Sequence, residues 1–115
     1  MMSADRRLRE LLTADRAATA DRIATLSQDL AGMVEAARLV ATDDEHDPEG
    51  STIAFERSQT SAFLADARTH LADLDSALER IDAGDYGRCE HCGKPIAAER
   101  LLARPSARTC IDCAV

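Results

Sequence analysis

All four cysteines of the chain stand in one short block near its end, and their spacing constrains the fold more than any other feature. Cys89 and Cys92 are followed after seventeen residues by Cys110 and Cys113, which gives the pattern CxxC-x17-CxxC. Each CxxC closes a tight turn that aims two thiolates at one point, and two such pairs joined by a loop are typical of a tetrahedral zinc site. The spacing therefore predicts one structural Zn²⁺ with these four cysteines as its ligands.

A disulfide pair and four free thiols are the alternatives to a zinc site. Both fit poorly, because closely spaced cysteine pairs in a reducing compartment indicate metal binding before disulfides. Redox sensing through the same thiolates stays open as a secondary role. Four thiolates leave no open coordination position, so we expect a structural metal and no enzyme activity. His91, between the first two cysteines, is expected to be an exposed residue of the turn.

The composition excludes several classes of protein. With 115 residues and two Phe, one Tyr and no Trp, the chain is one small domain without the aromatic residues for a thick core. No apolar run approaches the roughly 20 residues that span a bilayer, so we expect a cytoplasmic protein with no membrane partner. The formal net charge of -7 argues against a protein that grips phosphate backbones, and no sequence-specific DNA binding is expected.

Two long segments carry apolar residues at alternating steps of three and four, the pattern of a coiled-coil seam. They are expected to form helices from about residue 6 to 42 and from about 52 to 81, roughly 55 Å and 45 Å long at 1.5 Å a residue. The seam residues are Leu12, Ile23, Leu26, Leu30, Met33, Ala37 and Val40 in the first, and Ile53, Thr60, Leu64, Ala67, Leu71, Leu74, Leu78 and Ile81 in the second.

The two segments are separated by TDDEHDPEGS, residues 42–51, where Pro48 and Gly50 are expected to stop the helices. The fold class predicted is all-α dominated: a long antiparallel helical hairpin, a coiled coil with an acidic tip at about 43–51, plus a small C-terminal four-cysteine zinc finger. The expected domains are the hairpin, residues 1–83, and the finger, residues 84–115. Phe55 and Phe63 are expected to pack against the first helix, with an exposed contact of Phe55 near the tip as the alternative.

The cysteine block resembles the zinc-finger signature of the DksA/TraR family of bacterial transcription factors. The resemblance runs from Ala77 to Cys113, about a third of the chain. Its shared features are Tyr86-Gly87, Cys92-Gly93, Arg100-Leu101, Ala103-Arg104-Pro105 and the final CIDC. It implies a non-enzymatic regulator that binds core RNA polymerase directly and inserts its coiled-coil tip into the secondary channel, where it modulates initiation.

The resemblance also singles out individual residues. The family's tip pattern, Asp-x-x-Asp-x-Ala, matches Asp44 and Asp47, with Glu49 in place of the alanine. Arg104 matches a finger position through which some members contact the alarmone ppGpp together with the polymerase. Asp73 and Ala114 stand where lysines would be expected, so dependence on ppGpp is not supported.

Two other functions compete with the polymerase-binding regulator. The first is a zinc-stabilised coiled-coil adaptor or oligomerisation protein without a transcriptional role, which would not require an acidic tip. The second is a nucleic-acid-binding finger that uses the basic bias of Lys94, Arg100, Arg104 and Arg108, and the acidic net charge makes it the least favoured.

Overall fold

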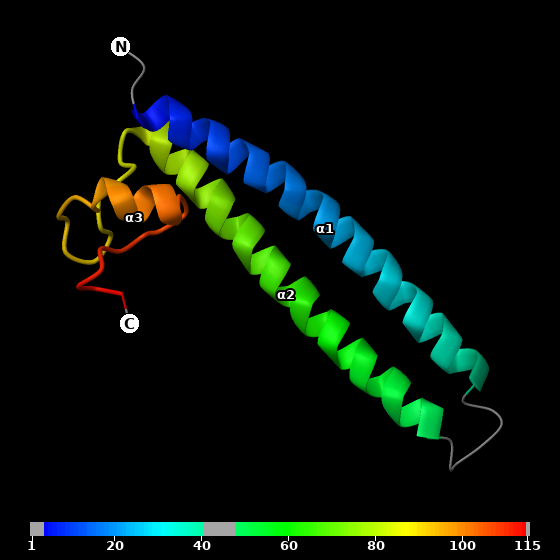
Figure 1. The fold of residues 1–115 in the computed structure, drawn as a ribbon. Coiled ribbons are helices and arrows are strands. Elements are labelled where there is room, and N and C mark those ends of the chain that lie inside the picture. The colour runs from blue at the N-terminus through cyan, green and yellow to red at the C-terminus, as the bar shows by residue number, and fades with distance from the viewer. Residues whose placement is uncertain (1–3, 41–47, 115) are drawn as a thin grey trace. The chain divides into compact units, whose positions relative to one another are not determined.

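Two long helices and one short helix make up the regular structure of the described residues. The computed structural model describes residues 4–40 and 48–114. Helix α1 spans Ala4–Val40, α2 spans Pro48–Ala83 and α3 spans Ala98–Ala103 (Figure 1). Within the described ranges there is no strand beyond an isolated bridge between Arg88 and Pro95. The all-α fold class is confirmed, with both long helices close to their predicted ranges.

Helix α2 begins at Pro48, earlier than the sequence pattern indicated. The prediction treated this proline as a helix stop. Proline is favoured in the first turn of a helix, because its fixed φ suits the helix and the N–H it lacks would have no partner there. Residues 48–51 of the predicted tip therefore belong to α2, and residues 43–47 lie outside the described residues.

Helix α2 ends at a glycine. Gly84 has a positive φ of 81°. Its N–H donates to the carbonyl of Ile81, and the N–H of Asp85 donates to the carbonyl of Arg80, at 3.2 and 2.8 Å. This pair of bonds is the Schellman motif, which satisfies the last carbonyls of the helix and turns the chain toward the cysteine block.

The chain divides into two compact units, which are described separately. The first comprises residues 1–18 and 70–115, and the second residues 19–69. In the first unit, the start of α1 and the end of α2 run antiparallel. Arg9 pairs with Asp82 and Arg16 pairs with Asp75, so seven residues forward on α1 correspond to seven residues back on α2. These ion pairs are partly exposed and add little stability each, but their spacing of one heptad marks the register of the helices.

The first unit contains a small apolar cluster between the two long helices. Leu12 and Leu74 are almost wholly buried, at 0% and 1% exposure, and pack with Ala77. Leu78, Ile81 and Tyr86 cover the cluster as half-buried neighbours. Of these three buried residues, Leu12 and Leu74 were on the predicted seam and Ala77 was not.

The second unit repeats the seam with less burial. Thr19, Leu64 and Ala67 are buried. The other described seam residues of this unit are half-buried: Ile23, Leu26, Leu30, Met33, Ala37, Ile53 and Thr60. The predicted seam is thus confirmed, and its half-buried state follows from its construction, because two helices alone cover an apolar stripe only in part.

The expectation that Phe55 and Phe63 pack against the first helix is wrong, whereas the alternative of an exposed Phe55 agrees with the structure. Phe55 is 67% exposed and Phe63 is 44% exposed, so neither packs fully against α1. The seam register explains the result. At 100° a residue, Phe55 lies roughly 150° around α2 from the line of Ile53, Thr60, Leu64 and Ala67, on the outer face of the helix.

Truncating Leu74 to alanine is expected to destabilise the fold by about 3 kcal/mol, because the change removes buried methyl groups and leaves a cavity at the centre of its cluster. Urea unfolding followed by circular dichroism measures the loss. Leu11→Ala is the control: this leucine is 42% exposed, and its truncation is expected to cost well under half as much. Equal losses in the two variants would contradict the assigned core.

Candidate metal centre

The four cysteines converge at one end of the first unit. Their Sγ atoms all lie within 4.8 Å of one another, and the Sγ atoms of Cys92 and Cys110 are 3.8 Å apart. A Zn²⁺ ion with four thiolate ligands at about 2.3 Å sets its sulfur atoms about 3.8 Å apart at the corners of a tetrahedron. The sulfur positions therefore fit a tetrahedral zinc ion after only a small contraction.

The first CxxC turn is organised by its own backbone. The N–H of Gly93 donates to the carbonyl of Cys89 at 2.9 Å, and the N–H of Cys92 points at the Cys89 Sγ at 3.5 Å. The N–H of Cys89 in turn donates to the carbonyl of Lys94 at 2.8 Å. Gly93 has a φ of 76°, a left-handed conformation that glycine adopts without strain. Gly93 therefore closes this turn without backbone strain.

The second CxxC turn closes in a similar way and is tied to the first. The N–H groups of Cys113 and Ala114 both donate to the carbonyl of Cys110, at 3.1 and 3.0 Å. The N–H of Glu90 donates to the carbonyl of Arg108 at 2.9 Å, which joins the two turns. These backbone bonds help to place the two thiol pairs facing one another.

The environments of the thiols differ in ways that suit metal binding. The backbone N–H groups of Cys110 and Cys92 stabilise the thiolate of Cys89 and lower its pKa to about 6. A hydrogen bond with the Cys110 side chain, together with burial, raises the pKa of Cys113 to about 12. Thiols crowded this closely cannot all ionise by themselves, because each new thiolate faces the charge of the others. A divalent cation removes that conflict and would hold all four as thiolates.

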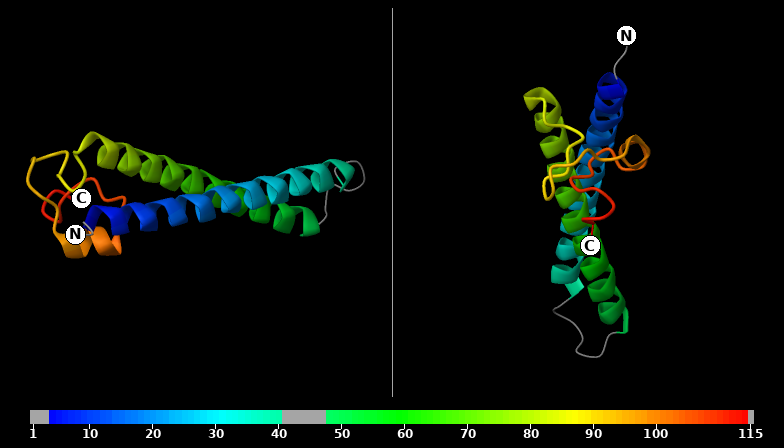
Figure 2. Two further views of the ribbon diagram at one scale, coloured as in Figure 1. Left: turned by 90° about the horizontal axis from the view of Figure 1, so that it is seen from above. Right: turned by 90° about the vertical axis from the view of Figure 1, so that its left-hand side faces the viewer.

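A second apolar cluster supports the thiols from one side. Cys89 is 2% exposed and packs with Leu8, Ile96 and Leu101. Leu8 comes from the first turns of α1 and Leu101 from α3, and both helices lie beside the cysteine block in the first unit (Figure 2). Leu8 was not on the predicted seam, although it stands four residues before Leu12, one step of the same pattern.

Two side-chain bonds fix the loop that joins the two CxxC turns. The hydroxyl of Tyr86 donates to the carbonyl of Pro105 at 2.8 Å, and Nε of Arg100 donates to the carbonyl of Thr109 at 2.9 Å. These contacts explain why Tyr86, Arg100 and Pro105 belong to the signature quoted above. Their partners are backbone carbonyls, which no pattern of residue types reveals.

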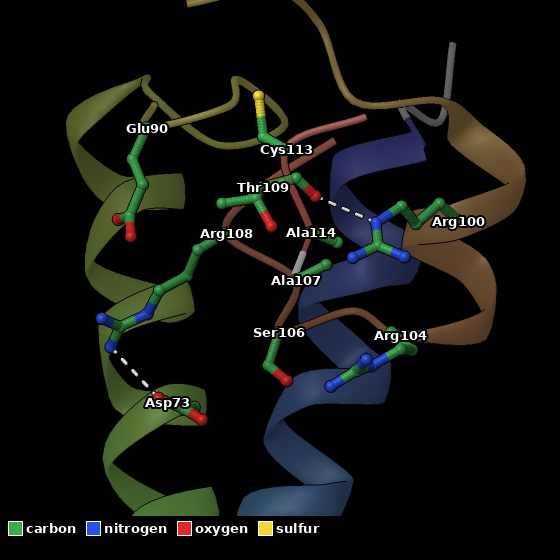
Figure 3. Close-up of a pocket in the computed structure, with 10 residues that line it drawn as sticks. All are labelled: Asp73, Glu90, Arg100, Arg104, Ser106, Ala107, Arg108, Thr109, Cys113 and Ala114. Atoms are coloured by element: carbon green, nitrogen blue, oxygen red, sulfur yellow. Dashed lines mark hydrogen bonds and ion pairs between the residues drawn. The ribbon is translucent and has the colours of Figure 1, made fainter. Parts of the chain in front are cut away.

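A cavity of about 480 Å³ adjoins the metal centre (Figure 3). Asp73, Glu90 and Arg108 lie on one side of it and Arg100 and Arg104 on the other. An Arg108 Nη donates to the Asp73 carboxylate at 3.2 Å, so a residue of α2 pairs with a residue of the finger on one side of this cavity. The lining is completed by Ser106, Ala107, Thr109, Cys113 and Ala114.

The predicted site residues fall into three groups. The four cysteines come together as described, and His91 is exposed. Arg104 lines the cavity with Asp73 and Ala114, the three positions that the resemblance associates with alarmone binding. The tip residues Asp44 and Asp47 lie outside the described residues. The ion pair of Asp73 and Arg108 was missed, since nothing in the sequence brings these positions together.

A sequence profile described as "Prokaryotic dksA/traR C4-type zinc finger" matches residues 84–115, which include all four cysteines. The chain is a zinc-finger protein of the DksA/TraR family. The DksA/TraR assignment and the clustered sulfur atoms agree on one structural zinc ion. The predicted boundary between a hairpin of residues 1–83 and a finger of residues 84–115 stays a prediction.

The similarity of this DksA/TraR chain to known proteins extends beyond the finger. It is 32% identical over 85 residues to the "RNA polymerase-binding transcription factor DksA" of Haemophilus influenzae, which covers 69% of this chain and 59% of that protein. It is 41% identical over 66 residues to the "Uncharacterized protein YteA" of Bacillus subtilis, covering 57% of this chain and 28% of YteA. The chain thus spans between about a quarter and three fifths of the length of these relatives.

The similarity extends to a solved structure of a DksA/TraR protein. Transcription factor DksA2 from Pseudomonas aeruginosa matches 94% of this chain with a TM-score of 0.76 and 29% sequence identity, and the match covers 78% of DksA2. The predicted family is thereby confirmed. No helix in the described part of the chain is both long enough and apolar enough to cross a membrane.

Proposed function

We propose that this protein binds RNA polymerase directly and regulates transcription initiation without catalysing a reaction. The observation that carries the proposal is the DksA/TraR finger, whose relative from Haemophilus influenzae is named for RNA polymerase binding and is similar over 85 residues. Sequence-specific DNA binding is not part of the proposal. Phosphate contacts need clustered Lys and Arg, and the chain carries 21 acidic against 14 basic residues.

In this proposal, the segment between α1 and α2 enters the secondary channel of the polymerase, and Asp44 and Asp47 act near the catalytic centre. Carboxylates there would act on the hydration of Mg²⁺ or on nearby basic side chains. The distribution of charge supports this role. Residues 19–69 carry ten Asp and Glu against four Arg and no Lys, which accounts for most of the net charge of the whole chain.

The finger contributes a second contact in this proposal, with Arg104 as the candidate residue. We further propose that the regulator works without ppGpp. The cavity that Arg104 lines also contains the carboxylates of Asp73 and Glu90, and Asp73 already neutralises Arg108. A highly anionic ligand would meet both carboxylates there, and their charge opposes its binding.

The test is retention of purified bacterial core RNA polymerase on the immobilised, zinc-loaded protein. We expect wild-type protein to retain the polymerase and the Cys110→Ser/Cys113→Ser variant to lose it, because the variant cannot hold the finger together. Adding ppGpp is expected to leave retention unchanged. Wild-type protein that retains no polymerase would overturn the proposal. Self-association in that same preparation would then favour the adaptor function.

A further inference from the structure

Both phenylalanines of the chain lie on the surface of α2. Phe55 is 67% exposed and Phe63 is 44% exposed, whereas the buried positions of α2 are held by Leu64, Ala67, Leu74 and Ala77. The only other aromatic residue, Tyr86, is half-buried beside both apolar clusters. A chain with so few aromatic residues thus leaves the two most apolar of them out of its core.

The exposed phenylalanines belong to a continuous uncharged surface, which we call the outer stripe. It consists of Thr52, Phe55, Gln59, Ala62 and Phe63, all of them exposed. Their spacings of three, four, seven and eight residues place them on one side of a helix. They lie between roughly 70° and 170° around α2 from the buried line of Leu64 and Ala67, counted at 100° a residue. The stripe therefore runs from the flank of the seam at Phe63 to the outer face of α2 at Phe55 and Ala62.

The outer stripe resembles the apolar face of a helix that docks in a groove. Such helices present anchors at spacings of three, four and seven residues, and aromatic anchors dominate the binding energy of many interfaces. Two carboxylates border the stripe: Glu56 lies about 20° around α2 from Phe63, and Asp66 lies at its C-terminal end. Among the described residues of α2, Phe55 and Phe63 are the only exposed large apolar side chains, so the apolar character is confined to this face.

The charge around the outer stripe indicates which kind of partner surface can bind it. Residues 19–69 have ten acidic and four basic side chains, so a second copy of this unit would bring like charges together. A partner surface rimmed by Lys and Arg would instead attract it. We propose that the outer stripe docks in an apolar groove of RNA polymerase rimmed by basic side chains, with Phe55 and Phe63 as its anchors. This inference rests on the proposed function and adds to it the surface that holds the protein on the enzyme.

The test compares full-length, zinc-loaded variants for binding to core RNA polymerase by fluorescence anisotropy. Phe55→Ser/Phe63→Ser is expected to weaken binding roughly tenfold or more, as the loss of two aromatic anchors does in other interfaces. Its thermal unfolding midpoint is expected to stay within a few degrees of wild type, because both side chains are exposed. Phe55→Leu/Phe63→Leu keeps an apolar stripe and is expected to retain most of the affinity.

Val34→Ser is the matched control, because Val34 is exposed to 41% on the other long helix of the same unit. Its affinity is expected to equal that of wild type. Polymerase binding that is unchanged in the double serine variant would overturn the stripe and leave the proposed function standing. No binding by wild type would overturn both. A large drop in the unfolding midpoint, or wild-type dimers that the double variant abolishes, would also overturn the inference, in favour of a packing role or of a second copy.

Discussion

Replacing Cys110 and Cys113 by serine is expected to abolish zinc binding and to unfold the finger. A structural zinc ion contributes roughly 10 to 16 kcal/mol of binding free energy to small zinc-finger peptides, which is folding free energy in such domains. The apolar cluster around the metal centre is too small to replace it, since its buried members are Leu8, Cys89, Ile96 and Leu101. Zinc content by mass spectrometry is expected to fall from one ion per chain to none.

Hydrogen exchange locates the damage. Protection is expected to disappear in residues 84–114 and to weaken at the start of α1, because Leu8 shares its cluster with Cys89. Residues 19–69 form a separate compact unit and are expected to keep their protection. Ile111→Ser is the control, because Ile111 stands between two cysteines yet is 72% exposed. A serine double variant that still binds one zinc ion would refute the assigned ligand set.

Replacing Asp44 and Asp47 by asparagine is expected to abolish the transcriptional effect while binding to core RNA polymerase changes little. The proposed tip acts through its two negative charges, and asparagine removes these charges while nearly preserving shape. Run-off transcription from several promoters measures the effect, and anisotropy measures the binding. Both assays use the same zinc-loaded preparation.

The control for the tip removes two carboxylates elsewhere. Asp21→Asn/Asp29→Asn changes the net charge by the same amount on the exposed surface of α1, and it is expected to leave the effect on transcription intact. If the Asp44/Asp47 variant regulates transcription like wild type, the tip is not the active element. Equal loss in both double variants would assign the effect to total charge and not to the tip.

The parts of the structure that were predictable depend on periodicity and spacing. The alternation of apolar residues located both helices and identified Leu64, Ala67 and Leu74 as core, because a helix in water must bury one face. The spacing of the cysteines located the metal centre, because a pair of CxxC turns leaves few other geometries. The exposure of Phe55 was also within reach, since its angle from the seam follows from residue numbers alone. The packed position expected for it followed from its hydrophobicity, whereas the alternative of an exposed Phe55 agrees with its angle from the seam.

Other features depend on contacts that residue types do not encode. The hydroxyl of Tyr86 and the guanidinium of Arg100 both end on backbone carbonyls of the loop between the CxxC turns. Asp73 and Arg108 meet only because the finger folds back on α2. The start of α2 at Pro48 depended on whether this proline ends one helix or begins another, and sequence rules allow both.

The heptad spacing of the two ion pairs at the base of the helices also discriminates against misalignment. In the observed register Arg9 meets Asp82 and Arg16 meets Asp75. Sliding α2 by one heptad would preserve the apolar seam and would offer Arg9 a new partner in Asp75. It would also set Arg16 opposite Arg68, and like charges in that position reject the slipped alignment. Arg16 thus disfavours a slipped alignment of the two helices that the repeating apolar seam by itself would allow.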